Sequence, residues 1–197
     1  MTDKLRRAWL RVSAKHTGRL LSTRNHPDLI DIPITTARLA IRRFEPADLA
    51  PYLQFMTDAE STRFLALEPD QETEPGARAL FDYVVRSYDA ANPVNAYAIA
   101  ERGTNDYVGS CGFAPYEAGV VECFYCINEE YRGLGFAVEA VGALLRALGT
   151  RIEVRAFCHS KNAVAHAVAT GSGMKHVGRA RNKNSGLEGE LFVYGGR

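Results

Sequence analysis

Short segments in which apolar and polar residues alternate recur along this 197-residue chain, as expected of strands that bury one face. Three of them, residues 95–101, 107–114 and 120–127, are separated only by short turns that contain Gly, Asn or Pro. This spacing predicts an antiparallel meander. Further strands are expected at residues 39–43, 152–157, 174–179 and 190–194.

Helices are expected between these strands. Leu80, Phe81 and Val84 share one side of residues 77–88, the spacing of an amphipathic helix, and Pro46 followed by Asp48 suits the first turn of another. The expected helices span residues 46–56, 77–88, 137–148 and 163–170. Because the third helix joins the meander to the next strand, the pattern predicts one strand–helix–strand crossover in a mostly antiparallel sheet. The fold class is therefore α+β.

Composition adds few constraints. Hydrophobic residues make up 46% of the chain and charged residues 24%, which is ordinary for a globular domain. The longest apolar stretches are interrupted by Arg132, Glu139 or Arg146, so none is long enough to form a transmembrane segment. Four cysteines are too few for a disulfide scaffold of this size, and we expect a cytoplasmic protein with reduced thiols.

The net charge of +1 hides an asymmetry. Residues 1–24 contain seven basic side chains against Asp3 alone, and their apolar residues are spaced so that a basic amphipathic helix could form. We therefore divide the chain into a basic N-terminal extension, residues 1–30, and one domain, residues 31–197. The extension is either a solvated helix packed on the domain or a segment that contacts RNA or the ribosome.

A glycine-rich segment, residues 131–137 (the anion loop), lies between a predicted strand and a predicted helix. Gly133 and Gly135 permit close approach to the main chain, and the N–H groups of a helix N-terminus attract a pyrophosphate. The loop lacks the Gly-Lys-Ser/Thr of a Walker A motif and the third glycine of a dinucleotide fingerprint. It matches Arg/Gln-x-x-Gly-x-Gly/Ala, through Arg132, Gly135 and Ala137. A glycine-rich helix entry without a ligand is the alternative.

Four segments together resemble the GNAT superfamily of acyl-CoA-dependent N-acyltransferases, and more narrowly its ribosomal-protein N-terminal acetyltransferase branch. They are residues 36–42, residues 122–127, the anion loop, and Asn162 followed by Gly173-Met174. The resemblance implies a sheet of six to seven strands with flanking helices, in which the fourth and fifth strands splay apart. It also implies acetyl-CoA as cosubstrate, no metal, and transfer of an acetyl group to a primary amine of a protein N-terminus or small molecule.

The same resemblance implies the cosubstrate-binding residues. The pantetheine arm would lie between the splayed strands against the backbone of the fourth, and the pyrophosphate would bind the anion loop. Asn162 would reach the arm from the far side, although it also suits the N-cap of the last helix. The expected contacts are Cys126, Ile127, Arg132, Gly133, Leu134, Gly135, Phe136, Ala137 and Asn162.

Glu122 is the candidate general base and Tyr125 the candidate general acid. Glu122 interrupts an apolar strand and matches a Glu of the branch pattern, although it could instead be a solvent-facing strand residue. Two departures from the family favour another reading, an acyl-CoA-binding sensor or scaffold without turnover. Leu134 replaces a common lysine of the anion loop, and Ala169 stands where many members have the tyrosine acid.

Three further groups bear on the chemistry. Cys123 and Cys126 lie three residues apart on a strand and so face opposite ways, which excludes a shared metal ion. His159 is a candidate contact near the expected thioester. Residues 58–74 hold six acids and one arginine. They form either an acidic rim that would attract a cationic amine or an ordinary solvated loop, whereas residues 181–189 are basic and polar. The sequence therefore leaves the acceptor amine open.

Overall fold

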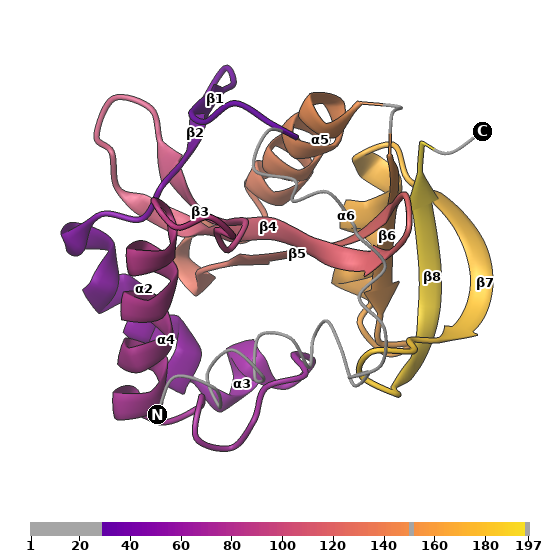
Figure 1. Ribbon diagram of the computed structural model, residues 1–197, viewed down its shortest axis with the longest axis horizontal. Coiled ribbons are helices and arrows are strands. Elements are labelled where there is room, and N and C mark those ends of the chain that lie inside the picture. Colours follow the sequence, from indigo (N-terminus) through magenta and orange to yellow (C-terminus); the bar gives the residue numbers. More distant parts are fainter. Residues whose placement is uncertain (1–28, 150–151, 196–197) are drawn as a thin grey trace.

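A computed structural model describes residues 29–149 and 152–195, and it forms one twisted sheet flanked by helices (Figure 1). The interpretation of residues 1–24 as a helical extension lies outside the described residues. The strands are arranged in the order β1-β2-β3-β4-β5-β6-β8-β7. They are β1 (Ile34–Thr35), β2 (Leu39–Arg42), β3 (Ala96–Glu101), β4 (Tyr107–Glu117), β5 (Val120–Ile127), β6 (Glu153–Cys158), β7 (Lys175–Arg181) and β8 (Glu188–Tyr194).

Strand pairing confirms the predicted mixed, mostly antiparallel sheet. Strands β2 to β5 form the meander, and β5 and β6 are the parallel neighbours among the described strands. Their connection is helix α5 (Phe136–Leu148), the expected crossover. The sheet has eight strands rather than six or seven because β1 adds a two-residue strand that pairs with β2. Two residues are too few to leave an alternating pattern, and the expected fourth and fifth strands are therefore β5 and β6.

The predicted helices are present with small shifts of their ends. Residues 46–56 divide into a 3₁₀ turn followed by α2, because Pro46 opens a tight first turn. Helix α3 was not expected, since four residues show no periodicity. The remaining elements are η1 (Pro46–Asp48), α2 (Leu49–Thr57), α3 (Ala59–Thr62), α4 (Glu74–Ser87), η2 (Glu129–Tyr131) and α6 (Ala163–Gly171). Within the described ranges, no helix is long and apolar enough to cross a membrane.

The helices cover both faces of the sheet. Helix α5 lies on one face of β3–β5 while α2, α3 and α4 lie on the other, and α6 lies beside α5 near β6 (Figure 1). Helix α4 buries Leu80, Phe81 and Val84, as its apolar spacing predicts. Helix α5 is buried more completely because its second half is almost wholly apolar. The core is therefore continuous on both sides of the central strands.

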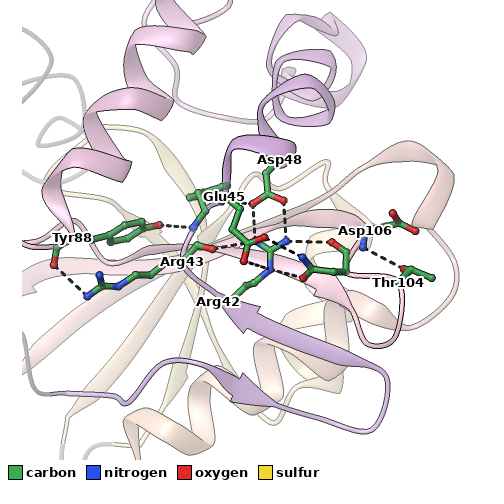
Figure 2. Close-up of polar contacts among 9 residues, drawn as sticks. Arg42, Arg43, Glu45, Asp48, Tyr88, Thr104 and Asp106 are labelled. Carbon is green, nitrogen blue, oxygen red and sulfur yellow. Dashed lines mark hydrogen bonds and ion pairs between the residues drawn. The ribbon is translucent and has the colours of Figure 1, made fainter.

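A buried ion pair fixes the start of α2 (Figure 2). The guanidinium of Arg42 donates to both carboxylate oxygens of Asp48, at 2.7 and 2.9 Å, and Asp48 is only 1% exposed. Arg42 Nε also donates to Asn105 Oδ1 at 2.8 Å, in the turn between β3 and β4. Because buried charges are stable only when they are paired and hydrogen-bonded, this cluster ties the α2 side of the molecule to the meander.

Candidate active site

Strands β5 and β6 pair only at one end. Their parallel register comprises Val120 with Glu153, Val121 with Val154 and Glu122 with Arg155. Beyond Glu122, β5 continues to Ile127 alongside β4, while β6 continues to Cys158 alongside β8. The two strands are thus held by different neighbours and separate in the middle of the sheet, which is the splay expected of the fourth and fifth strands.

A cavity of about 270 Å³ opens at this separation. Its walls come from β5, β6, α2, the segment between α3 and α4, and the loop between β7 and β8. The lining residues include Phe64, Leu65, Leu67, Glu122, Tyr125, Cys126, Cys158, His159, Asn162, Asn182 and Leu187.

The two faces of β5 meet different parts of the molecule. Cys126 Sγ lies 3.1 Å from Ser110 Oγ and contributes to the electrostatic environment of Tyr52 on α2, so its face, shared with Glu122, is the α2 face. The Tyr125 hydroxyl donates to the carbonyl of Ala165 in α6 at 2.9 Å, which defines the α6 face. Cys123 and Cys126 therefore face opposite ways, as predicted, and all four cysteines are free. The described residues contain no group of three or more His, Cys, Asp or Glu that could hold a metal ion.

Glu122 is half-buried on the α2 face, with its Oε2 fully enclosed, rather than exposed to solvent. Its Oε1 accepts a 2.6 Å hydrogen bond from Asn182 Nδ2, while its buried Oε2 has no partner among the described residues. Burial raises the pKa of Glu122 to about 7, and the hydrogen bond from Asn182 opposes that rise. A carboxyl group with this pKa is ionised in roughly half of the molecules at neutral pH, which suits a general base.

Asn182 was not identified from the sequence. It is 3% exposed, and its Oδ1 accepts the backbone N–H groups of Asn184 at 2.8 Å and Ser185 at 3.2 Å. These two bonds fix the orientation of the amide, so Nδ2 points at Glu122. The local sequence Asn-Lys-Asn-Ser-Gly is typical of such a turn, but nothing in it indicates a partner sixty residues away.

Tyr125 lies on the opposite side of β5 from Glu122. Besides its bond to Ala165, its hydroxyl lies 3.9 Å from Cys158 Sγ. Burial raises the pKa of Tyr125 well above its ordinary value, so the phenol keeps its proton at physiological pH. The two candidate catalytic residues therefore border the same cavity from two sides.

The anion loop presents backbone rather than side chains. Gly133 and Gly135 both have φ of 78°, in the left-handed region that other residues adopt only with strain. Gly135 is the N-cap of α5 and supplies no capping side chain. The first N–H groups of α5 are thus available to an anion. Phe136 packs its ring in the core while Leu134 is 52% exposed, so the expected contact of Phe136 with a ligand can involve only its main chain.

Two arginines hold the loop. Arg38 was missed by the sequence analysis: it donates to the carbonyl of Leu134 at 2.9 Å and to Glu139 Oε2 at 2.7 Å, and it lies over the ring of Phe136. Arg132 donates to Ser61 Oγ at 2.6 Å and to the carbonyl of Ile127 at 3.3 Å. Arg132 therefore links the loop to α3 and to the end of β5.

Asn162 fulfils the N-cap alternative and also lines the cavity. Its Oδ1 accepts the N–H of Ala165 at 3.1 Å, which caps α6, and its side chain forms part of the wall. His159 lines the cavity as well, and its ring stacks on Phe64 with the centroids 5.0 Å apart. The six acids of residues 58–74, all of them described, do not line it; that segment contributes Phe64–Leu67 and Gln71 instead. This arrangement favours the solvated-loop interpretation of these acids over that of an acidic rim.

The sequence profile of the Acetyltransferase (GNAT) domain family matches residues 38–175 of this chain. A curated protein of Bacillus licheniformis named "Uncharacterized N-acetyltransferase p20" is 29% identical over 112 residues, which is 56% of this chain. The match spans 62% of the length of that relative.

Solved structures share the fold. The spermidine N-acetyltransferase of Vibrio cholerae, solved with CoA and spermine, has a TM-score of 0.64 at 15% identity and matches 81% of this chain and 96% of its own. The ribosomal-protein-S5-alanine acetyltransferase of Vibrio fischeri has a TM-score of 0.62 at 13% identity, over 83% of this chain and 96% of its own. The fold alone therefore does not distinguish a polyamine acceptor from a protein acceptor.

Proposed function

This chain belongs to the GNAT acetyltransferase family, and from that premise we propose that it transfers an acetyl group from acetyl-CoA to a primary amine by direct attack on the thioester. The observation that carries the proposal is the separation of β5 from β6 with Glu122 and Tyr125 on its two sides. Direct transfer needs a base where the amine enters and an acid where the thiolate leaves. A single strand supplies both because residues three apart on it face opposite ways.

We propose the following roles. Glu122, acting directly or through one water, takes the proton that the amine loses as its nitrogen bonds to the carbonyl carbon. Main-chain N–H groups of β5 near Cys126 and Ile127 stabilise the oxyanion. When the carbon–sulfur bond breaks, the hydroxyl of Tyr125 gives its proton to the thiolate and is reprotonated from solvent. The products are an amide and the free thiol of CoA.

The residues that would bind acetyl-CoA fit its parts. The pyrophosphate would lie at the N–H groups of α5 between Gly133 and Ala137, where the positive end of the helix dipole attracts an anion. The pantetheine arm would lie along β5 as an additional strand, between Ile127 and Asn162. Main-chain recognition of this kind makes the missing lysine at Leu134 tolerable.

Ala169 favours a second candidate, an acyl-CoA-binding sensor or scaffold without turnover. Ala169 is fully buried in α6, so no hydroxyl reaches the cavity from this position. Tyr125 compensates in our proposal, because its hydroxyl already contacts α6 one turn earlier, at Ala165.

Two measurements on the full chain separate the candidates. Calorimetry reports whether acetyl-CoA binds, and a thiol-release assay with peptides, simple amines, polyamines and aminoglycosides reports turnover. Binding together with release for at least one amine supports the enzyme. Binding with no release for any amine supports the scaffold.

Two broader assignments belong to the same proposal. The free state of all four cysteines supports a location in the reducing cytoplasm. The seven basic residues among positions 1–24 support RNA or ribosome contact by the N-terminal extension. Binding to RNA at increasing salt, with and without residues 1–28, tests the second assignment.

A further inference from the structure

The wall of the cavity on the α2 face is apolar. Helix α2 contributes Tyr52, Phe55 and Met56, the segment after α3 contributes Phe64–Leu67, and the loop before β8 contributes Leu187. Leu187 is 57% exposed and Leu65 is 37% exposed. Large apolar side chains left exposed at the mouth of a cavity indicate a ligand that covers them. The acids of residues 58–74, which the sequence left open as a rim, are not part of this wall.

Negative charge is scarce in the same place. Among the described lining residues the carboxylates are those of Glu122 and Glu188. Three acids of the neighbouring segment have other partners. Asp58 accepts the N–H of Ser61, and Glu60 and Glu74 pair with the arginines three and four residues further on.

The cost of removing ammonium groups from water then favours a monoamine acceptor over a polyamine or an aminoglycoside. A polyamine or an aminoglycoside brings several ammonium groups, and each needs a carboxylate or water once it is enclosed. A monoamine needs one partner, and Glu122 provides it through the unpaired Oε2. An α-amine is also easier to deprotonate than a lysine side chain, because its ordinary pKa is about 7.7–8.0 rather than about 10.4.

The position of the apolar wall relative to Glu122 gives the shape of the acceptor. Phe64 stacks on His159 at the end of β6, so the segment after α3 and the end of β6 meet across the mouth. Leu187 and Asn182 come from one loop, and Asn182 contacts Glu122. Because Phe64 and Leu187 line the same cavity as Glu122, they are the candidate contacts for the substituents nearest to an amine that reaches Glu122.

We propose that the acceptor is an α-amine whose adjacent side chain is apolar, aliphatic or aromatic, and that Phe64 and Leu187 form the subsite for that side chain. This inference rests on the proposed function and names its acceptor class. The N-terminus of a peptide and a free amino-acid derivative share this chemistry.

The test compares amines on the full chain with saturating acetyl-CoA. The probes are glycinamide, leucinamide, phenylalaninamide, spermidine and kanamycin, together with two tripeptides that begin with Leu or Ser. We expect kcat/KM for leucinamide to exceed that for glycinamide by about 10- to 100-fold, since each buried methylene favours the larger substrate severalfold. A Leu tripeptide that surpasses leucinamide identifies a peptide source, and equal values identify a small molecule.

Matched variants locate the subsite. Leu187→Ser should reduce the leucinamide-to-glycinamide ratio about 3- to 10-fold, and Phe64→Ser should reduce it similarly. The control is Val177→Ser, because Val177 on β7 is equally exposed, at 63%, and does not line the cavity; its ratio should equal that of the unmodified chain.

Three outcomes would overturn the inference. Preferential acetylation of spermidine or kanamycin would do so and leave the proposed function intact. A flat amine profile with a preference for longer acyl thioesters would assign the apolar wall to the acyl chain. Binding of acetyl-CoA without thiol release for any of the amines would remove the proposed function and the acceptor class together.

Discussion

The anion loop and the cavity on the α2 face present different chemical groups to their ligands. The loop offers main-chain groups of one short stretch, while the side chain of Leu134 is exposed, that of Phe136 packs in the core, and that of Arg132 binds Ser61. The cavity offers side chains from several distant stretches, among them Phe64, Glu122 and Asn182. A loop that binds through its main chain can hold a group common to many relatives. A cavity lined by side chains changes its ligand whenever one of those side chains changes.

The largest expected effect is on the anion loop, which binds through its main chain. Gly135→Glu should abolish acetyl-CoA binding, because it places a carboxylate at the anion site and a side chain on a residue with positive φ. A Cβ at this position would be 3.5 Å from the nearest atom, Arg38 Nη2, so the fold has room for the change. Calorimetry with acetyl-CoA measures the loss, which we expect to be at least about 100-fold.

Gly119→Glu is the control for that experiment. Gly119 lies in the turn between β4 and β5 with nearly the same φ, 77°, and open space around it. It should bind acetyl-CoA normally. Equal affinity in both variants would contradict our assignment of the loop.

The next-largest effect is expected in the cavity, where side chains carry the chemistry. Glu122→Gln keeps the hydrogen bond from Asn182 and removes the base, so kcat should fall by about 10²- to 10⁴-fold with little change in acetyl-CoA affinity. In the unmodified chain the rate should rise with pH through about 7, where Glu122 ionises. The variant should lose this rise, and a normal rate with a normal pH profile would exclude Glu122 as the base.

Glu122→Gln should also stabilise the fold in alkaline solution. Because the pKa of Glu122 is raised to about 7 in the folded chain, its carboxyl group destabilises the fold. The effect is greatest at pH values where the group is ionised in both the folded and the unfolded state. Below its unfolded pKa of about 4.3 it is protonated in both states, and the folded state has no such disadvantage. The variant should therefore melt at a higher temperature than the unmodified chain at pH 8 and show a smaller difference at pH 4. Loss of turnover together with loss of stability at pH 8 would indicate a misfolded variant.

A smaller effect sharpens the link between the β7–β8 loop and the base. Asn182→Leu removes the hydrogen bond that opposes the rise in the pKa of Glu122, so the ionisation should move to higher pH. We expect about a fivefold lower rate at pH 7 and a nearly unchanged rate at pH 9. Asn184→Leu, in the same loop but without a bond to Glu122, should keep the original pH midpoint. A rate lowered equally at all pH values would make Asn182 merely structural.

The smallest effect concerns the support of the anion loop. Arg38→Met removes the bond to the Leu134 carbonyl and the ion pair with Glu139. Because Arg38 is half exposed, we expect only about a two- to fivefold weaker affinity for acetyl-CoA. Arg43→Met removes a comparable surface pair with Asp89 away from the loop and should have no effect on affinity. A loss as large as that of Gly135→Glu would mean that the backbone of the loop depends on this side chain.

The same contrast explains what the sequence could predict. The meander, the crossover helix and the anion loop are local patterns, since alternation, helical spacing and positive-φ glycines occur within a few residues of one another. Strand β1 and helix α3 were missed because two and four residues leave no period. Both depend on contacts that the surrounding fold provides.

The side-chain part of the site was predicted less well. Glu122 stood out because it interrupts an apolar strand, and Tyr125 because of its place in the same run. Asn182 and Arg38 act through partners about sixty and one hundred residues away, which no local pattern can indicate. The acids of residues 58–74 left the acceptor open for the same reason: composition does not show that Asp58 and Glu60 contact partners in their own segment.

Because β5 and β6 pair only at one end, each has an unpaired edge in the middle of the sheet. Edges of this kind are where protein chains pair with one another and aggregate, and a guest lying along the edge closes it as an added strand does. Acetyl-CoA would then complete the architecture as well as react in it. Because a ligand that binds only the folded chain increases the folded population with its concentration, the lifetime of this protein in a cell would follow the supply of acetyl-CoA.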